Sequence, residues 1–150
     1  MPLAPPPRNA QGEVLPHDHD GILPDDGIIR RIPSRHVIDD DKIGGRRISS
    51  MAFEPSSGLN GGMSVDLQRL IEEAGHNARE FVISSGWVGA VRFNAADFRR
   101  EGLQVGFDPL IDNLYHGEVW GKFTRAKKRK LLQLCKWFVE IPNVSIDGSG

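Results

Sequence analysis

The stretch WVGAVRFNAADFRREGLQVGF, residues 87–107, decides the fold class. Residues 87–93 are rich in aromatic and β-branched side chains, which is typical of a strand. Asn94 can then cap a short helix over residues 95–100, with Gly102 after its end. Residues 103–107 read as a strand again. Strand, helix and strand follow one another here without the regular alternation of a parallel α/β sheet, which favours an α+β fold.

Outside this stretch, hydrophobic spacing predicts further short elements. Three runs read as strands: residues 28–32, 46–53 and 114–120. Residues 67–74 carry apolar side chains at helical spacing, and Ser64 or Asp66 can cap that helix. A last helix is predicted for residues 125–139. We therefore expect a small mixed or antiparallel sheet with about three helices.

The amino-terminal segment differs in composition from the rest of the 150 residues. Six of the ten prolines lie in residues 1–26, and large apolar side chains are few there. Such a segment buries little surface to offset the entropy lost on ordering. We expect residues 1–26 to be a disordered or loosely docked arm, residues 27–143 a single domain, and residues 144–150 a flexible tail.

Bulk properties narrow the class of protein. The formal net charge is −1, and Cys135 is the only cysteine, so an internal disulfide is excluded. No run approaches the roughly 20 apolar residues that cross a bilayer. These properties predict a soluble, cytoplasmic chain that does not bind membranes, and no motif indicates a bound cofactor or a metal.

A basic cluster at the start of the last predicted helix is the most unusual local feature. Its members are Lys122, Arg125, Lys127, Lys128, Arg129 and Lys130. Positive charge at a helix start opposes the helix dipole, so stability alone would not favour it. An anionic partner would offset that cost, either an acidic protein surface or nucleic acid. The alternative is a surface that only confers solubility.

Two other groups of residues carry chemistry by type and spacing. His17 and His19, each followed by an aspartate, could face one metal ion, although their position in the arm favours a docking or linker segment. His116 and Glu118 share one face of a predicted strand. They could act as an acid–base pair or form a structural hydrogen bond.

The order of three residues resembles ADP-ribosyltransferase-like enzymes and toxins. Arg30 lies on an early strand, Ser50 on a second, and Glu118 late in the domain. The resemblance implies a pocket for a dinucleotide, with Glu118 at the ribose and His116 beside it. The chain lacks the Ser-Thr-Ser run and the paired glutamates of that family.

Two hypotheses follow from these patterns. The first is an interaction module that binds an anionic partner, protein or nucleic acid, through the basic cluster. The second is an ADP-ribosyltransferase-like or nucleotide-processing enzyme, which could serve as a toxin or defence effector. Its cleft would contain Arg30, Ser50, His116 and Glu118. The enzyme hypothesis requires Arg30 and Glu118 to approach each other, and the module requires an exposed positive surface.

Overall fold

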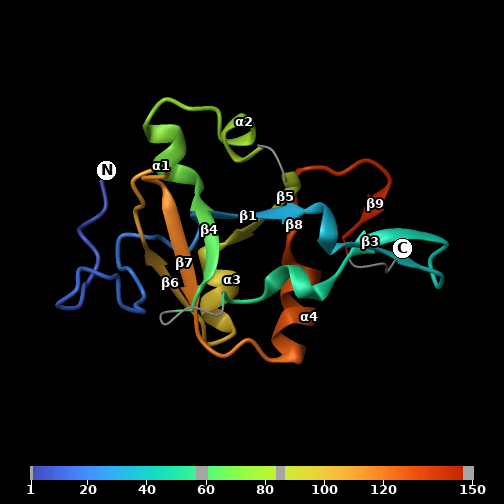
Figure 1. Cartoon of the computed structure of the whole chain (residues 1–150), viewed down its shortest axis with the longest axis horizontal. Helices are drawn as coiled ribbons and strands as arrows, with labels where there is room; N and C mark the ends of the chain where they lie inside the picture. Colours follow the sequence, from blue (N-terminus) through green and yellow to red (C-terminus); the bar gives the residue numbers. More distant parts are fainter. Residues whose placement is uncertain (1, 57–60, 84–86, 147–150) are drawn as a thin grey trace.

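A computed structural model describes residues 2–56, 61–83 and 87–146, and these residues form an α+β fold (Figure 1). The elements follow in chain order: β1 (Gly27–Pro33), η1 (Ser34–His36), β2 (Val37–Asp40), β3 (Gly45–Ile48), η2 (Ser50–Phe53), β4 (Met63–Leu67), α1 (Gln68–Glu73), α2 (Ala78–Val82), β5 (Trp87–Asn94), α3 (Ala95–Arg100), β6 (Gln104–Phe107), β7 (His116–Trp120), α4 (Arg125–Leu134), β8 (Lys136–Val139) and β9 (Val144–Ser145). A six-stranded antiparallel sheet has the order β6-β7-β4-β1-β5-β8, and a three-stranded mixed sheet has the order β2-β3-β9.

The large sheet has a hydrophobic core on each face. On one side α3, α4 and η2 pack over it, and Phe93 lies between Phe53 and Phe98 with ring centroids 5.5 and 4.5 Å away. On the other side α1 and α2 contribute Ile71 and Val82, which pack with Ile29 of β1. The two cores arise from the alternation along each strand, because successive side chains point to opposite faces of the sheet.

The strand–helix–strand prediction for residues 87–107 is confirmed by β5, α3 and β6. Asn94 begins α3 in a capping box, in which its backbone N–H donates to Asp97 Oδ2 at 2.9 Å. Thr124 likewise caps α4 by accepting from the Lys127 N–H at 3.2 Å. Local capping chemistry therefore sets the start of both helices.

The last helix is shorter than predicted. Residues 125–139 do not form one helix, because α4 ends at Leu134 and Lys136–Val139 is strand β8. Cys135 has extended backbone angles between them. Trp137 and its neighbours are aromatic or β-branched side chains, and antiparallel pairing with β5 overrides their helical spacing.

Strand β4 was missed by the sequence analysis. Residues 63–67 are a strand between β1 and β7, so Ser64 and Asp66 face the sheet surface and do not cap α1. The strand predicted for residues 46–53 is also divided, into β3 and the turn of helix η2. Short polar residues between apolar ones fit a cap and a strand equally well, and the sheet decides between them.

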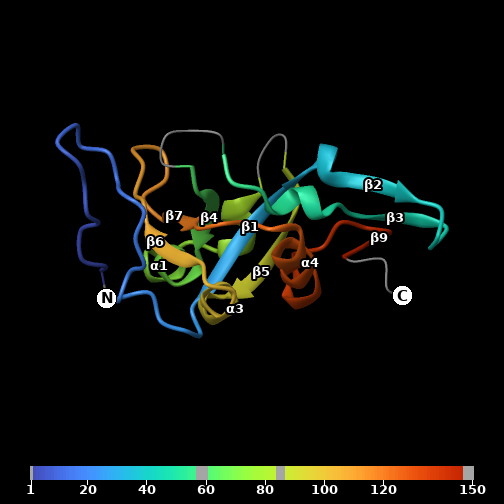
Figure 2. The same ribbon diagram turned by 90° about the horizontal axis from the view of Figure 1, so that it is seen from below.

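The amino-terminal arm, which was expected to be disordered or loosely docked, follows a defined path in the structure. It runs along the β6 edge of the sheet and then beneath it toward β1 (Figure 2). His19 donates its backbone N–H to the carbonyl of Val105 at 2.9 Å, and Ile22 is buried in the core. Arg69 of α1 donates to the Gly21 carbonyl at 2.7 Å. The open edge of β6 supplies hydrogen-bond partners for the arm, and the low apolar content of the arm did not predict them.

The carboxyl-terminal residues 144–145, which composition assigned to the tail, form β9 and pair in parallel with β3. Residues 57–60 and 147–150 lie outside the described ranges. Within those ranges no helix is long and apolar enough to span a bilayer.

Gly106→Ala tests how closely the arm packs on the sheet. A Cβ at Gly106 would lie 2.7 Å from the His17 carbonyl and would collide with the Trp120 ring. We expect the substitution to lower the free energy of unfolding by about 1–3 kcal/mol, measured by urea denaturation. Gly45→Ala is the control, because its Cβ would meet nothing within 4 Å. Equal effects of the two substitutions would contradict this packing.

Candidate active site

The candidate site begins where strands β1 and β4 stop pairing. Their register covers only Ile28 with Leu67 and Ile29 with Asp66, whereas β1 continues to pair with β5 as far as Pro33. The two strands therefore separate beyond Ile29, and backbone groups of β4 need other partners there.

Arg30 supplies those partners. Its Nη1 donates to the Ser64 carbonyl of β4 at 2.8 Å, and its Nε donates to the Ala52 carbonyl of η2 at 3.0 Å. Burial lowers the pKa of Arg30 to about 10, although the negative charge of Glu118 opposes that shift. The guanidinium therefore remains positive at neutral pH and lies within the field of Glu118.

His116 and Glu118 meet on β7, on the face where α1 and α2 pack. Antiparallel register places them opposite Asp66 and Ser64 of β4. His116 Nε2 is 3.8 Å from Glu118 Oε1. Its Nδ1 donates to the Asp108 carbonyl at 2.9 Å and lies 3.3 Å from Asp108 Oδ2. Asp108 therefore fixes the ring so that Nε2 faces the glutamate.

The protonation of this pair is shifted toward neutral pH. Burial raises the pKa of Glu118 to about 7, against the opposing positive charges of His116 and Arg30. Burial also disfavours the imidazolium, but the hydrogen bonds to Asp108 and the charge of Glu118 outweigh it and raise the pKa of His116. Glu118 can therefore gain or lose a proton near pH 7, next to an imidazole whose pKa is also raised.

The second carboxylate oxygen of Glu118 is buried. Among the described residues, Oε2 has no hydrogen-bond partner. Gly62 packs directly against it, and a Cβ there would lie 2.6 Å from Oε2. An unpaired carboxylate oxygen in such surroundings favours the neutral acid, which agrees with the raised pKa of Glu118.

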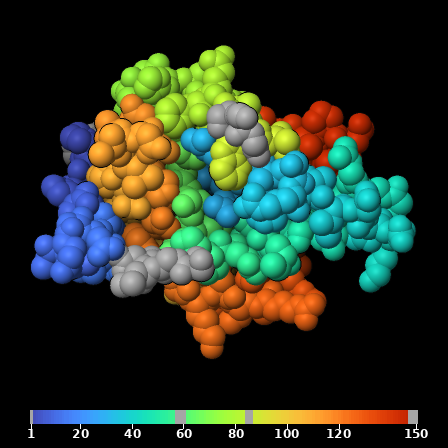
Figure 3. Space-filling view, viewed as in Figure 1, coloured from blue at the N-terminus to red at the C-terminus, as the bar shows by residue number. Residues whose placement is uncertain are grey.

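A cavity of about 490 Å³ lies beside this pair. Its walls include two guanidinium groups, two aromatic rings, an amide and the imidazole: Arg30, Arg31, Phe81, Trp87, Asn113 and His116. The space-filling view shows a hollow where the orange, light blue and yellow-green segments meet (Figure 3). Its volume is in the range of small-molecule sites.

One wall of the cavity is held by a buried ion pair. Arg31 binds Asp66 through Nε and Nη2, at 2.8 and 3.1 Å, and Asn113 Nδ2 donates to the same carboxylate at 2.8 Å. The Arg31 guanidinium also lies over the Phe81 ring, 5.8 Å from its centroid. Asp66 neutralises Arg31, so this pair positions the wall.

The structure brings some of the predicted catalytic residues together. Arg30, His116 and Glu118 surround Ser64, as the hydrogen bonds and the β4–β7 register place them. Ser50 is half-buried at the start of η2, and it is the carbonyl of Ala52 in this helix that contacts Arg30. The strand predicted for Ser50 is therefore a helical turn.

The predicted binding cluster is divided by the structure. Lys128 Nζ pairs with Glu54 Oε1 at 2.6 Å, and Lys127 is half-buried. The exposed members are Lys122, Arg125, Arg129 and Lys130. Four of the six cations are therefore exposed, three of them on α4 and Lys122 just before it.

Sequence reasoning missed Asp108, Ser64 and Gly62. Asp108 precedes a proline and was interpreted only as the end of a strand. Ser64 was interpreted as a helix cap. Ser64 and Asp66 alternate with apolar side chains over residues 63–67. This alternation was the signal that could have placed Ser64 and Asp66 on one face of a strand.

Asp108, His116 and Glu118 offer ligand atoms that lie within 4.8 Å of one another, which raises the question of a metal ion. The two carboxylates lie against opposite nitrogens of one imidazole, however, and Nδ1 is bound to a backbone carbonyl. An ion would therefore have to use Nε2, the nitrogen that faces Glu118. The same arrangement, with Glu118 facing Nε2 and Asp108 holding Nδ1, also allows a proton to pass between His116 and Glu118.

Comparison with known proteins gives no match to a family model, to a curated protein or to a solved structure.

Glu118→Gln should change how stability depends on pH. A raised carboxyl pKa makes ionised Glu118 unfavourable in the folded state, so wild-type stability falls as pH rises from about 4.5 to 7. Gln removes this cost. We expect the variant to gain about 1–2 kcal/mol relative to wild type between pH 5 and pH 8, after discounting for partial exposure.

Thermal and urea unfolding across that pH range would measure the difference. Glu140→Gln is the matched control, because Glu140 is exposed after β8. A stability difference between Glu118→Gln and wild type that stays constant with pH would contradict the raised pKa of Glu118.

Proposed function

We propose that this chain is a small enzyme that performs acid–base chemistry on a nucleotide-type substrate. The observation that carries the proposal is the contact between His116 and Glu118 at a cavity whose wall includes the buried cation Arg30. Buried titratable groups with shifted pKa values, gathered at a cleft, are typical of active sites.

The residues divide into three roles under this proposal. His116 lines the cavity, and its Nε2 is the atom that moves the proton: Nε2 receives a proton from the neutral Glu118 carboxyl and passes it to the substrate, or carries one in the reverse direction, while Nδ1 keeps its bond to Asp108. Asp108 positions the imidazole through Nδ1. Groups with pKa values near the working pH are the most effective in such transfers.

The cavity supports a substrate with a flat ring and an anionic group. Phe81 and Trp87 offer aromatic faces, Asn113 offers hydrogen bonds, and Arg30 offers positive charge. The approach of Arg30 to Glu118 also supports the resemblance to ADP-ribosyltransferase-like enzymes. The helical position of Ser50 is a departure from that family.

The experiment is a turnover assay with nucleotides and dinucleotides, including NAD⁺, with products separated by chromatography. Glu118→Gln and His116→Asn should each lower turnover at least about 100-fold, because each removes a proton-transfer group. His116→Asn keeps an amide donor for the Asp108 carbonyl. Glu140→Gln should retain wild-type turnover. Unfolding curves would show that all three variants fold.

Turnover of any nucleotide that persists within twofold in both Glu118→Gln and His116→Asn would reject these catalytic roles. Absence of binding by every nucleotide tested, measured by calorimetry, would reject the substrate class.

A second candidate function is the binding of an anionic partner by α4, the interaction module. Arg125, Arg129 and Lys130 are exposed, and no acidic residue lies between Glu118 and Glu140 in the sequence. Along the helix no acidic residue interrupts these cations, and a run of positive charge attracts polyanions. Nucleic acid and an acidic protein segment are both candidates.

Binding to labelled single-stranded DNA and to polyglutamate, followed by fluorescence anisotropy, tests this candidate. For DNA, the triple variant Arg125→Ala, Arg129→Ala, Lys130→Ala should reduce the slope of log affinity against log salt by roughly 2–3. The control is Lys42→Ala with Arg46→Ala on the β2–β3 hairpin, which also removes exposed charge. Equal binding by the triple variant and wild type would reject α4 as the surface.

A further inference from the structure

The arm is fastened to the edge of the large sheet by side chains. Strand β6 pairs with β7 on one side only. On its outer side the Val105 N–H donates to Asp18 Oδ1 at 2.8 Å, and the Phe107 N–H donates to His17 Nε2 at 3.1 Å. The backbone N–H of His19 donates to the Val105 carbonyl. Three consecutive arm residues therefore replace a neighbouring strand.

The hydrogen bonds fix one neutral tautomer for each imidazole. His17 Nδ1 lies 2.8 Å from the Leu15 carbonyl and must donate, so Nε2 is the acceptor for Phe107. His19 has the opposite tautomer: Nε2 donates to the Ala4 carbonyl at 2.8 Å, and Nδ1 accepts from the Gly21 N–H at 2.9 Å. Both nitrogens of each ring are therefore used.

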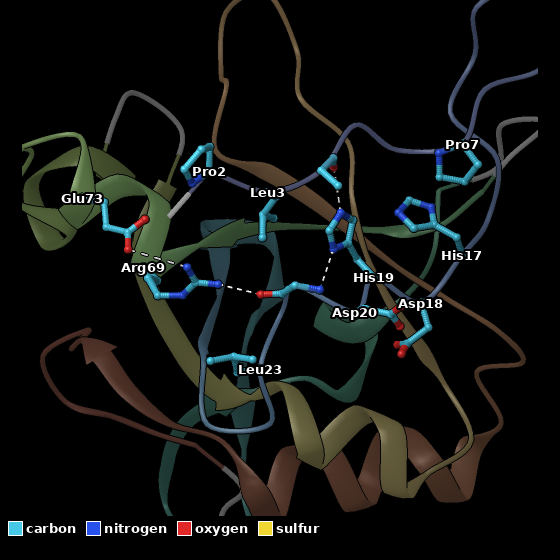
Figure 4. Close-up of a pocket in the computed structure, with 12 residues that line it drawn as sticks. Pro2, Leu3, Pro7, His17, Asp18, His19, Asp20, Leu23, Arg69 and Glu73 are labelled. Atoms are coloured by element: carbon cyan, nitrogen blue, oxygen red, sulfur yellow. Dashed lines mark hydrogen bonds and ion pairs between the residues drawn. The ribbon is translucent and has the colours of Figure 1, made fainter.

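Figure 4 shows His19 held between these two backbone groups, with His17 beside it. This arrangement also answers the metal question raised by the sequence. A metal needs a free lone pair on each imidazole, and the lone pairs of His17 and His19 accept backbone N–H groups. The arm histidines dock the segment and do not form a metal site in this conformation.

Protonation would break one hydrogen bond between the arm and β6 and one hydrogen bond within the arm. An imidazolium has two N–H donors, so the proton added to His17 would face the Phe107 N–H, and that added to His19 would face the Gly21 N–H. His19 is also only 8% exposed, which makes its charged form costly.

The charged groups around the rings have other partners. Asp18 binds Arg99 at 2.9 Å, and Arg69 binds Asp26 at 3.0 Å and Glu73 at 3.6 Å. Asp20 is exposed. Asp18, Asp20, Arg69 and Glu73 line the cavity of about 600 Å³ that the arm forms with α1. Within the described chain, no carboxylate forms an ion pair with either imidazole.

The attached segment covers the part of the sheet that lies next to Glu118. The His17 ring packs on Trp120 with centroids 5.2 Å apart, and Trp120 is only 4% exposed. His17 also lies over Gly106, which is the register partner of Glu118 in β7. Release of the arm would therefore uncover Trp120 and the sheet surface next to the acid–base pair.

We propose that residues 2–22 form a pH-sensitive strap: neutral His17 holds it on β6, neutral His19 holds its folded shape, and protonation of these imidazoles releases it. Release would free the Val105 and Phe107 amides from their arm partners. We therefore expect a local change that leaves the rest of the sheet intact. The proposal does not depend on the catalytic function.

Hydrogen exchange of the Val105 and Phe107 amides, normalised to unstructured peptides, measures the strap directly. Because protonation favours the released state, the protection of both amides should fall at least about tenfold at pH 5.5 relative to pH 7.5. Amides of β1 and β5 should keep their protection, which distinguishes release from unfolding.

The variant His17→Gln with His19→Asn places side-chain carbonyls where the rings accept hydrogen bonds and removes both titrations. Its Val105 and Phe107 amides should keep the same protection at both pH values. His76→Asn, at an exposed histidine on the opposite side of α1, should respond as wild type does.

Two results would overturn the proposal: unchanged protection in wild type at pH 5.5, or an equal pH response in the double variant. If the double variant does not fold, His17→Gln alone must reduce the response at Phe107. An undiminished response there also overturns the proposal.

Discussion

The guanidinium of Arg30 occupies the point at which the large sheet opens. It donates to a carbonyl of β4 and to a carbonyl of η2, and so links two segments that no strand pairing joins at this level. A planar group with several fixed donors can make both bonds while remaining charged, which an ammonium group could not do with the same geometry. The cavity, the η2 turn and the environment of Glu118 all depend on this link.

The acid–base pair and the core are built by the same strand alternation. Residues of β7 that face α3 and α4, such as Val119, complete the hydrophobic core. Their neighbours His116 and Glu118 face the other side, where the sheet is only partly covered. A shift of one residue in the β4–β7 register would exchange these sets and bury the polar groups in the core. Fold stability and site geometry are therefore determined by one register.

The elements that the sequence predicted are those in which local chemistry and the tertiary environment agree. Residues 87–107 combine strand composition with a capping box at Asn94 and Asp97, and the structure keeps that order. His116 and Glu118 share a face because period-two alternation is a local property. Asp108 reaches His116 because of the path of the loop before β7, and Ser64 lies opposite Glu118 because of the register between β4 and β7. Neither the loop path nor the register is a local property of the sequence. The same holds for Lys128, whose partner Glu54 is distant in the chain.

The contacts of the arm bear on how the protein can be shortened. Composition places the domain boundary near Gly27, and a chain cut there would keep every helix and strand of both sheets. It would lose the groups that accept from Val105 and Phe107, however, and leave β6 as an uncovered edge next to an apolar Trp120. Edges of this kind pair with other copies of the same chain and promote aggregation. The proline-rich segment thus covers a strand edge that the fold behind it leaves open.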